Sequence, residues 1–271
     1  MFAPGGPHIT KASIVTMRIP RKNAREITKM RDAGRLVAES FALIREHISA
    51  GVSLRDLDRL TEEYIISQGA TSLYKGYRGS QINHPPFPGV ICASVNNEIC
   101  HGLPDDRILN NGDIVGIDIG LRYRGYCGDA CVTFAVGEIS PEAQHLMDVA
   151  QMSLQRGIGA ARMGNYLFDI GTAIEDYADS QGVSVVREWG GHGIGKQLHE
   201  APSVSHTRMP VRGPKLKSGM VFTIEPMINL GRQEWKLLDD GWTVITQDGS
   251  LSAQFEHTIA ITRNGPEILT I

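Results

Sequence analysis

The stretch that decides the fold is residues 114–136, which read IVGIDIGLRYRGYCGDACVTFAV. Its two apolar runs predict a pair of strands that form a hairpin around Tyr123–Arg124. In that register Asp118 and Asp129 would lie opposite one another on one face, with their Cβ atoms roughly 5 Å apart. Two carboxylates that close repel one another unless a cation lies between them. The pair therefore indicates a metal site rather than two solvated aspartates.

Three more charged side chains interrupt apolar or glycine-rich segments farther along the chain. They are His192 in GGHGIG, Glu225 in VFTIEP and Glu256 in QFEH. Alone, each has an ordinary alternative: a turn histidine, an edge-strand carboxylate paired with an arginine, or a surface glutamate. Together with the two aspartates they make four carboxylates and one imidazole, and buried carboxylates require pairing, protonation or a metal.

The charges of this set predict a site for two divalent metal ions. Four negative carboxylates are neutralised by two divalent cations, and water bound between such ions loses a proton near neutral pH. Oxygen-rich ligation with one imidazole suits Mn, Fe or Co as well as Zn, so the sequence does not choose the metal.

Composition excludes several classes of protein. The 271 residues are 41% hydrophobic and 21% charged, which excludes disordered, collagen-like and disulfide-scaffold chains. The net charge of -3 gives no overall field for nucleic acid, so no sequence-specific nucleic-acid partner is expected. The N-terminus lacks an apolar signal region and nothing approaches a membrane span, so we expect a cytoplasmic protein.

The cysteines do not have the paired spacing of a structural zinc site. We expect reduced thiols, and a disulfide between Cys92 and Cys100 across a hairpin stays open. The four positions are Cys92, Cys100, Cys127 and Cys131.

The pattern along the chain predicts one domain behind a leader. Residues 1–23 are glycine- and proline-rich and then basic, which predicts a flexible extension, either solvated or in contact with a polyanion such as ribosomal RNA. Residues 24–271 alternate a helix pair, strands, a second helix pair and more strands, which predicts an α+β fold with a largely antiparallel sheet and two similar halves. The expected helices are 24–48, a segment from the Ser53 cap to Gly69, 141–161 and 167–181. The expected strands are 90–94, 98–101, 114–121, 126–136, 185–188, 221–227, 242–246 and 255–262.

Several motifs, in order, resemble those of the type I methionine aminopeptidases of the bacterial kind, within the pita-bread metallopeptidases. The resemblance spans most of the chain from residue 25 onward and implies a curved sheet with helices on its outer face. The matching runs are SVNNEICHG at 94–102, ID at 117–118 with GD at 128–129, GHGIG at 191–195, HEAP at 199–202, FTIEP at 222–226 and AQFEH at 253–257.

The resemblance implies a role for each metal-site residue. Asp118 would bind one metal ion, while Asp129 and Glu256 would bridge both. His192 and Glu225 would bind the other ion, and Glu225 would also move the proton of the attacking water.

The resemblance also implies two histidines that act on the peptide. His199 would hydrogen-bond the scissile carbonyl or the tetrahedral intermediate, and His101 would stabilise or protonate the departing nitrogen. Asn96 and Ser252 match positions that hold a monovalent cation mainly through backbone carbonyls.

A pocket for the methionine side chain is implied as well, since a thioether suits a soft aromatic cavity. The sequence departs from the family here: residues Ser80–Pro86 form an insertion, Phe87 replaces the usual tyrosine, and Leu198 replaces a bulkier aromatic residue. The expected pocket residues are Tyr77, Phe87, Cys92, Leu198 and Trp242.

The implied activity is removal of the initiator methionine from nascent chains whose second residue is small. The ribosome is an expected partner and the expected state is a monomer. Two alternatives stay open: an Xaa-Pro aminopeptidase or prolidase of the same fold, and a non-catalytic pita-bread module that binds proteins. The short interval between His192 and Glu225 leaves no room for the helical insert of type II enzymes.

Overall fold

The structure, a computed structural model, describes residues 18–79 and 85–271. Four helices lie within these residues, with ends only one or two residues from the predicted ones. Their bounds are α2 Ala24–His47, α3 Leu54–Ser67, α4 Pro141–Ala160 and α5 Asp169–Ser180.

Polar caps set where three of these helices begin. Asn23 and Glu26 form a capping box at α2, and the Ser53 and Ser140 hydroxyls accept from backbone N–H groups at the start of α3 and α4. Pro141 at the first position of α4 has no N–H to leave unpaired. These local signals explain why the helix bounds were predictable.

The strands of the described residues pair antiparallel throughout and form four small sheets. The sheet orders are β1-β4-β2 with β5 on β4, β13-β10-β6, β11-β12-β3, and β15-β14-β9-β7-β8. The bounds are β1 Thr71–Ser72, β2 Cys92–Val95, β3 Glu98–Cys100, β4 Ile114–Tyr123, β5 Tyr126–Ala135, β6 Ser184–Val185, β7 Gly191–Gly193, β8 Glu200–Val204, β9 Val221–Ile224, β10 Met227–Asn229, β11 Trp235–Leu237, β12 Val244–Thr246, β13 Ser252–Gln254, β14 His257–Thr262 and β15 Gly265–Ile268.

The hairpin of β4 and β5 forms as predicted, but the predicted register was wrong. Tyr123 pairs with Tyr126, so the turn is at Arg124 and Gly125, both of which have positive φ angles. This two-residue turn with left-handed residues suits the strand twist. Asp118 consequently pairs with Cys131, not with Asp129.

One predicted strand is divided in the structure, and another is shorter than predicted. The run 221–227 breaks into β9 and β10 at Glu225 and Pro226, and the run 255–262 begins only at His257, after β13. The N–H of Glu225 bonds the Nε2 atom of His206, and that of Glu256 bonds the Cys131 carbonyl. Both glutamates therefore lie where the chain leaves one sheet for the next.

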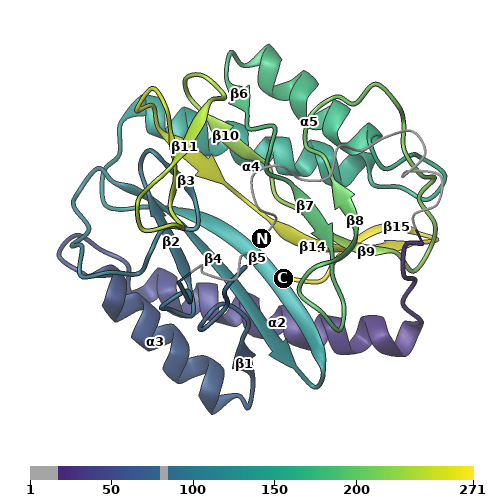
Figure 1. Cartoon of the computed structure of the whole chain (residues 1–271), viewed down its shortest axis with the longest axis horizontal. Coiled ribbons are helices and arrows are strands. Elements are labelled where there is room, and N and C mark those ends of the chain that lie inside the picture. Colours follow the sequence, from purple (N-terminus) through teal and green to yellow (C-terminus); the bar gives the residue numbers. More distant parts are fainter. Residues whose placement is uncertain (1–17, 80–84) are drawn as a thin grey trace.

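The molecule consists of two halves, each with a helix pair packed outside its strands (Figure 1). In the first half α2 and α3 pack with β4 and β5 around one apolar cluster. In the second half α4 packs on β9, β10 and β13, and α5 packs on α4 and β6, around another apolar cluster. A third cluster lies between them, where β5 contacts β14. The predicted α+β class with helices outside the strands is confirmed.

The segment before α2 contacts the second half. Residues 1–17 of the expected extension lie outside the described residues. The backbone N–H of Lys22 donates to the Gly219 carbonyl at 2.6 Å, and the Lys22 ammonium pairs with Glu200 at 2.5 Å. Among the residues that the structure describes, none of the helices has the length and apolar character needed to cross a bilayer.

Candidate metal centre

The first two candidate ligands come from the β4–β5 hairpin. Asp118 pairs with Cys131 and Asp129 pairs with Gly120, so the two aspartates are diagonal neighbours on one face. The hydroxyl of Tyr74 lies 2.6 Å from the Oδ1 atom of each. The expectation of a shared face is confirmed, and the expectation of a directly opposed pair is wrong.

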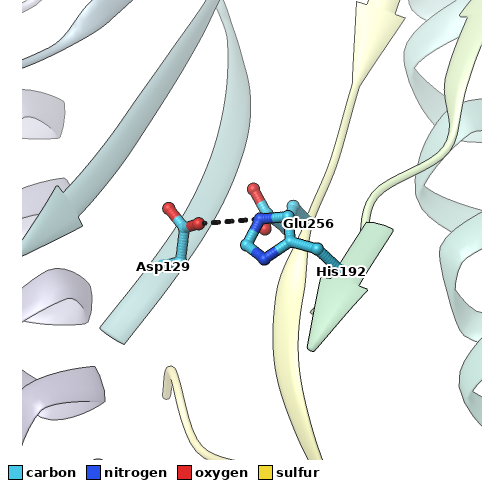
Figure 2. Close-up of side chains that lie close together, drawn as sticks. All are labelled: Asp129, His192 and Glu256. Carbon is cyan, nitrogen blue, oxygen red and sulfur yellow. Dashed lines mark ion pairs between the residues drawn. The ribbon is translucent and has the colours of Figure 1, made fainter. Parts of the chain in front are cut away.

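The imidazole of His192 faces this hairpin from the other half of the molecule (Figure 2). Its Nε2 atom lies 3.4 Å from Oδ2 of Asp129 and 3.8 Å from Oε1 of Glu225. Its Nδ1 atom contacts the Gly193 carbonyl at 3.1 Å. A backbone carbonyl on Nδ1 favours the tautomer that leaves the Nε2 lone pair for a metal ion.

The two glutamates complete the group. The Thr223 hydroxyl donates to Oε1 of Glu225 at 2.6 Å. Glu256 is 2% exposed, and its Oε1 atom has no hydrogen-bond partner among residues 18–79 and 85–271. A buried carboxylate oxygen without a partner is costly, which indicates that a cation belongs there.

The geometry fits a metal ion. Ligand atoms of Asp129, His192 and Glu256 all lie within 4.8 Å of one another, and all three side chains are buried (Figure 2). One imidazole nitrogen with carboxylate oxygens is a donor set that suits divalent transition metals. Asp118 is linked to this group by Tyr74, whose hydroxyl contacts both Asp118 and Asp129. Glu225 is linked to it by its contact with Nε2 of His192.

The acid–base properties of the site agree with a cation that holds the carboxylates together. Burial raises the pKa of Asp118 and Glu256 well above their usual values, and neighbouring carboxylates add to the rise. Burial likewise raises the pKa of Glu225 to about 7. Burial opposes protonation of His192, but Asp129 and Glu225 raise its pKa overall. Without metal, protons must take the place of the missing positive charge.

Of the two predicted catalytic histidines, His199 lies against this group. The ring of His199 is 4.4 Å from the ring of His192, centroid to centroid, and burial lowers the pKa of His199 so that the ring stays neutral. His101 has a φ of 59° and places its ring 5.2 Å from that of Trp189.

The five expected pocket residues belong to one apolar cluster that also contains Tyr74. Phe87 meets Trp242 edge-on at 5.2 Å, and Tyr77 lies 6.4 Å from Trp242 and 6.0 Å from His199. The ring nitrogen of Trp242 donates to the carbonyl of Pro85, in the part of the insertion that the structure describes. Positions 80–84 of the insertion lie outside the described residues. Cys92 and the other three cysteines are buried free thiols.

Asn96 and Ser252, the expected cation pair, are brought together from distant parts of the chain. The N–H of Ser252 donates to the carbonyl of Asn96 at 2.9 Å. Asn96 has a φ of 57°, and its side-chain oxygen accepts from the N–H of Ile114.

Sequence reasoning missed the residues that hold the ligands in place. Tyr74 contacts both aspartates, Thr223 contacts Glu225, and His206 accepts from the Glu225 backbone. Burial lowers the pKa of His206 to about 3, which keeps it a neutral acceptor. Only the TIEP motif included one of them, Thr223, and nothing near Tyr74 or His206 in the sequence marked them.

Comparison with known proteins identifies the family. A model of the metallopeptidase family M24 matches residues 28–263. The methionine aminopeptidase of Clostridium perfringens is 47% identical over 250 residues, which cover 92% of this chain and 98% of that protein.

Solved structures agree with this assignment. The crystal structure of the methionine aminopeptidase from Rickettsia prowazekii superposes with a TM-score of 0.89 at 41% identity, covering 94% of this chain and all of that one. The Xaa-Pro dipeptidase of Bacillus anthracis is more distant, with a TM-score of 0.71 at 25% identity, covering 92% of this chain and 61% of that one. The implied pita-bread fold is confirmed. The chain therefore belongs to the metallopeptidase family M24 and, within it, groups with the methionine aminopeptidases.

Proposed function

We propose that this protein is a methionine aminopeptidase that uses two divalent metal ions to remove the initiator methionine from chains with a small second residue. The observation that carries the proposal is the buried group of Asp129, His192 and Glu256, in which one carboxylate oxygen has no hydrogen-bond partner in the part of the chain that the structure describes. Asp118 and Glu225 extend that group, so the donor set suffices for two ions.

Each protein group has a task in this proposal. When bound, the metal ions supply a strong nucleophile at neutral pH and polarise the scissile carbonyl. Glu225, a buried carboxylate whose Oε1 atom lies 3.8 Å from Nε2 of His192, is placed to accept the proton of the attacking water and release it again. Neutral His199 donates an N–H to the oxygen that becomes negative. His101 stabilises the departing nitrogen.

The methionine side chain would enter the aromatic cluster beside the site. Phe87, Tyr77 and Trp242 offer ring faces and edges to a thioether, and Leu198 and Cys92 complete the lining. Because Tyr77 lies 6.0 Å from His199, a side chain held there would put its carbonyl near the histidine.

Metal-dependent cleavage of Met-Ala-Ser, compared with an Ala-Pro peptide, tests the proposal. Complete chelation should abolish cleavage of Met-Ala-Ser without unfolding the protein, as followed by circular dichroism. Re-addition of Mn, Fe, Co or Zn to the metal-free protein identifies the metal that restores activity. Full activity should need two equivalents of that metal. Activity that persists after complete metal removal would reject the mechanism, and preferential cleavage of the Ala-Pro peptide would favour the prolidase alternative.

Further properties of the enzyme belong to the same proposal. We expect a cytoplasmic monomer that meets nascent chains at the ribosome, and a monovalent cation held near Asn96 and Ser252. Co-sedimentation with ribosomes tests the ribosome contact. Light scattering tests whether the protein is a monomer.

A further inference from the structure

The hydroxyl of Tyr74 lies between the two aspartates of the candidate metal centre. It is 2.6 Å from Oδ1 of Asp118 and 2.6 Å from Oδ1 of Asp129, and the side chain is 5% exposed. Asp129 divides its two oxygens: Oδ1 contacts Tyr74, whereas Oδ2 faces Nε2 of His192 at 3.4 Å. One oxygen of that carboxylate is thus anchored and the other is directed toward the metal centre.

The backbone around β1 delivers this hydroxyl. Ser72 in β1 pairs with Leu121 in β4, and the N–H of Leu73 donates to the Gly120 carbonyl at 2.9 Å. The N–H of Tyr74 then bonds the Ser72 hydroxyl at 3.1 Å. These contacts turn the chain back over β4, so that the tyrosine ring lies on the face that carries Asp118.

Gly120 leaves the space that the ring occupies. It pairs with Asp129 across the hairpin. A Cβ atom at position 120 would lie 2.6 Å from Cε1 and 2.9 Å from Cζ of Tyr74. The φ angle of Gly120 is not positive, so the need for space, rather than the backbone conformation, explains why a glycine stands here. Any side chain here would push the hydroxyl away from the aspartates.

We propose that Tyr74 is a positioning residue that orients Asp118 and Asp129 toward the metal ions, and that Gly120 is the glycine its ring requires. This inference rests on the metal site of the proposed function. A phenol has one proton, so it donates to one Oδ1 atom at a time, and the second carboxylate depends on a cation for compensation. Outer-shell partners of this kind restrict the orientation of ligands and raise affinity.

Removal of the hydroxyl alone tests the role of Tyr74. Calorimetric titration of metal-free Tyr74→Phe with Mn²⁺ should show an affinity about 10- to 100-fold weaker than that of the unchanged protein. The absorption bands of the Co²⁺-loaded protein should also shift, because the ligands change orientation.

Tyr126→Phe is the matched control. Its hydroxyl donates to Glu26 at 2.9 Å, and its side chain is 6% exposed in the same apolar cluster. This variant also removes a hydroxyl from a carboxylate, but Glu26 is not a candidate metal ligand, so Mn²⁺ affinity should stay within twofold of the unchanged protein.

A second variant tests whether the Tyr74 ring needs the space that Gly120 leaves. Gly120→Ala should weaken Mn²⁺ binding by displacing Tyr74. Gly116→Ala on the same strand should not, because its Cβ meets only ordinary contacts, the nearest at 3.6 Å. If Gly120→Ala acts through the hydroxyl, the double variant with Tyr74→Phe should lose less affinity than the product of the two single losses.

The outcomes separate this inference from the proposed function. Unchanged Mn²⁺ affinity and an unchanged Co²⁺ spectrum in Tyr74→Phe, with metal bound normally by the parent protein, would overturn the positioning role alone. Should Tyr74→Phe fail to fold, Gly120→Ala with full affinity gives the same negative result. A parent protein that binds no divalent metal would overturn the proposed function itself.

Discussion

At the residue scale, the centre consists of charged groups that only one another and a metal ion can compensate. Asp129, Glu225 and Glu256 are each less than a tenth exposed, and no described residue hydrogen-bonds the Oε1 atom of Glu256. His199 is different, because burial keeps its ring neutral beside His192. A neutral ring can donate to substrate without taking a ligand position.

This difference predicts that a substitution of His199 lowers catalysis without lowering metal binding. His199→Ala should lower kcat for Met-Ala-Ser by about 100-fold or more, as loss of an oxyanion donor does. Metal content, measured by plasma emission spectroscopy, should be unchanged. His145→Ala, at an exposed position of α4, serves as the control and should change neither quantity. Equal loss of activity and metal in His199→Ala would assign His199 a structural role instead.

At the element scale, two glycines let α2 pack closely against β5 and against the segment after β15. A Cβ at Gly128 would lie 2.8 Å from the backbone nitrogen of Gly34, and a Cβ at Gly34 would lie 2.0 Å from the carbonyl oxygen of Leu269. The helix can therefore approach the hairpin that carries both aspartates more closely than side chains would allow.

We expect Gly128→Ala to lower the free energy of unfolding by about 1–3 kcal/mol, because the helix must move away. Gly159→Ala, in the last turn of α4, meets no atom within 4 Å and should stabilise the helix by about 0.5–1 kcal/mol. Urea denaturation of both variants measures the two effects. An unchanged midpoint for Gly128→Ala would show that α2 can shift at no cost.

At the scale of the whole molecule, the candidate ligands join the two halves. Asp118 and Asp129 come from β4 and β5, whereas His192 comes from β7, and Glu225 and Glu256 lie between strands of the half that contains α4 and α5. A metal ion bound here would therefore hold the halves together as well as serve the chemistry. Its stabilising effect follows ligand binding to the folded state.

This predicts that metal stabilises the protein more at pH 8 than at pH 6. Asp118, Glu256 and Glu225 have raised pKa values, about 7 for Glu225, so the metal-free protein holds extra protons at pH 6. A raised carboxyl pKa means that stability is lost as the pH rises through that value. The metal ion replaces those protons, so its benefit increases over the same interval.

Differential scanning calorimetry with and without a fixed excess of Mn²⁺ measures this difference. The rise in Tm on adding metal should be larger at pH 8 than at pH 6. Groups away from the metal site affect both forms alike, so their contributions to the difference cancel. The same rise at both values would contradict proton–metal competition at these carboxylates.

Much of the fold was predictable from local signals. The helices follow from Asn23, Ser53 and Ser140 caps and from apolar periodicity, which act over a few residues. The strand that ends before Glu225 was predictable as an apolar run. Its break into β9 and β10 was not predicted; there the N–H of Glu225 donates to His206, a residue 19 positions earlier in the chain, instead of to a neighbouring strand.

The candidate metal centre was likewise predictable only in part. The sequence by itself determined which residue types stand in apolar surroundings, and so indicated a metal site, since an isolated buried charge is too costly to keep. Only the tertiary structure decided that the hairpin turns at Arg124 and Gly125, and that Tyr74 reaches both aspartates over Gly120. Those contacts join segments far apart in the chain, and their strength depends on distances that no local pattern contains.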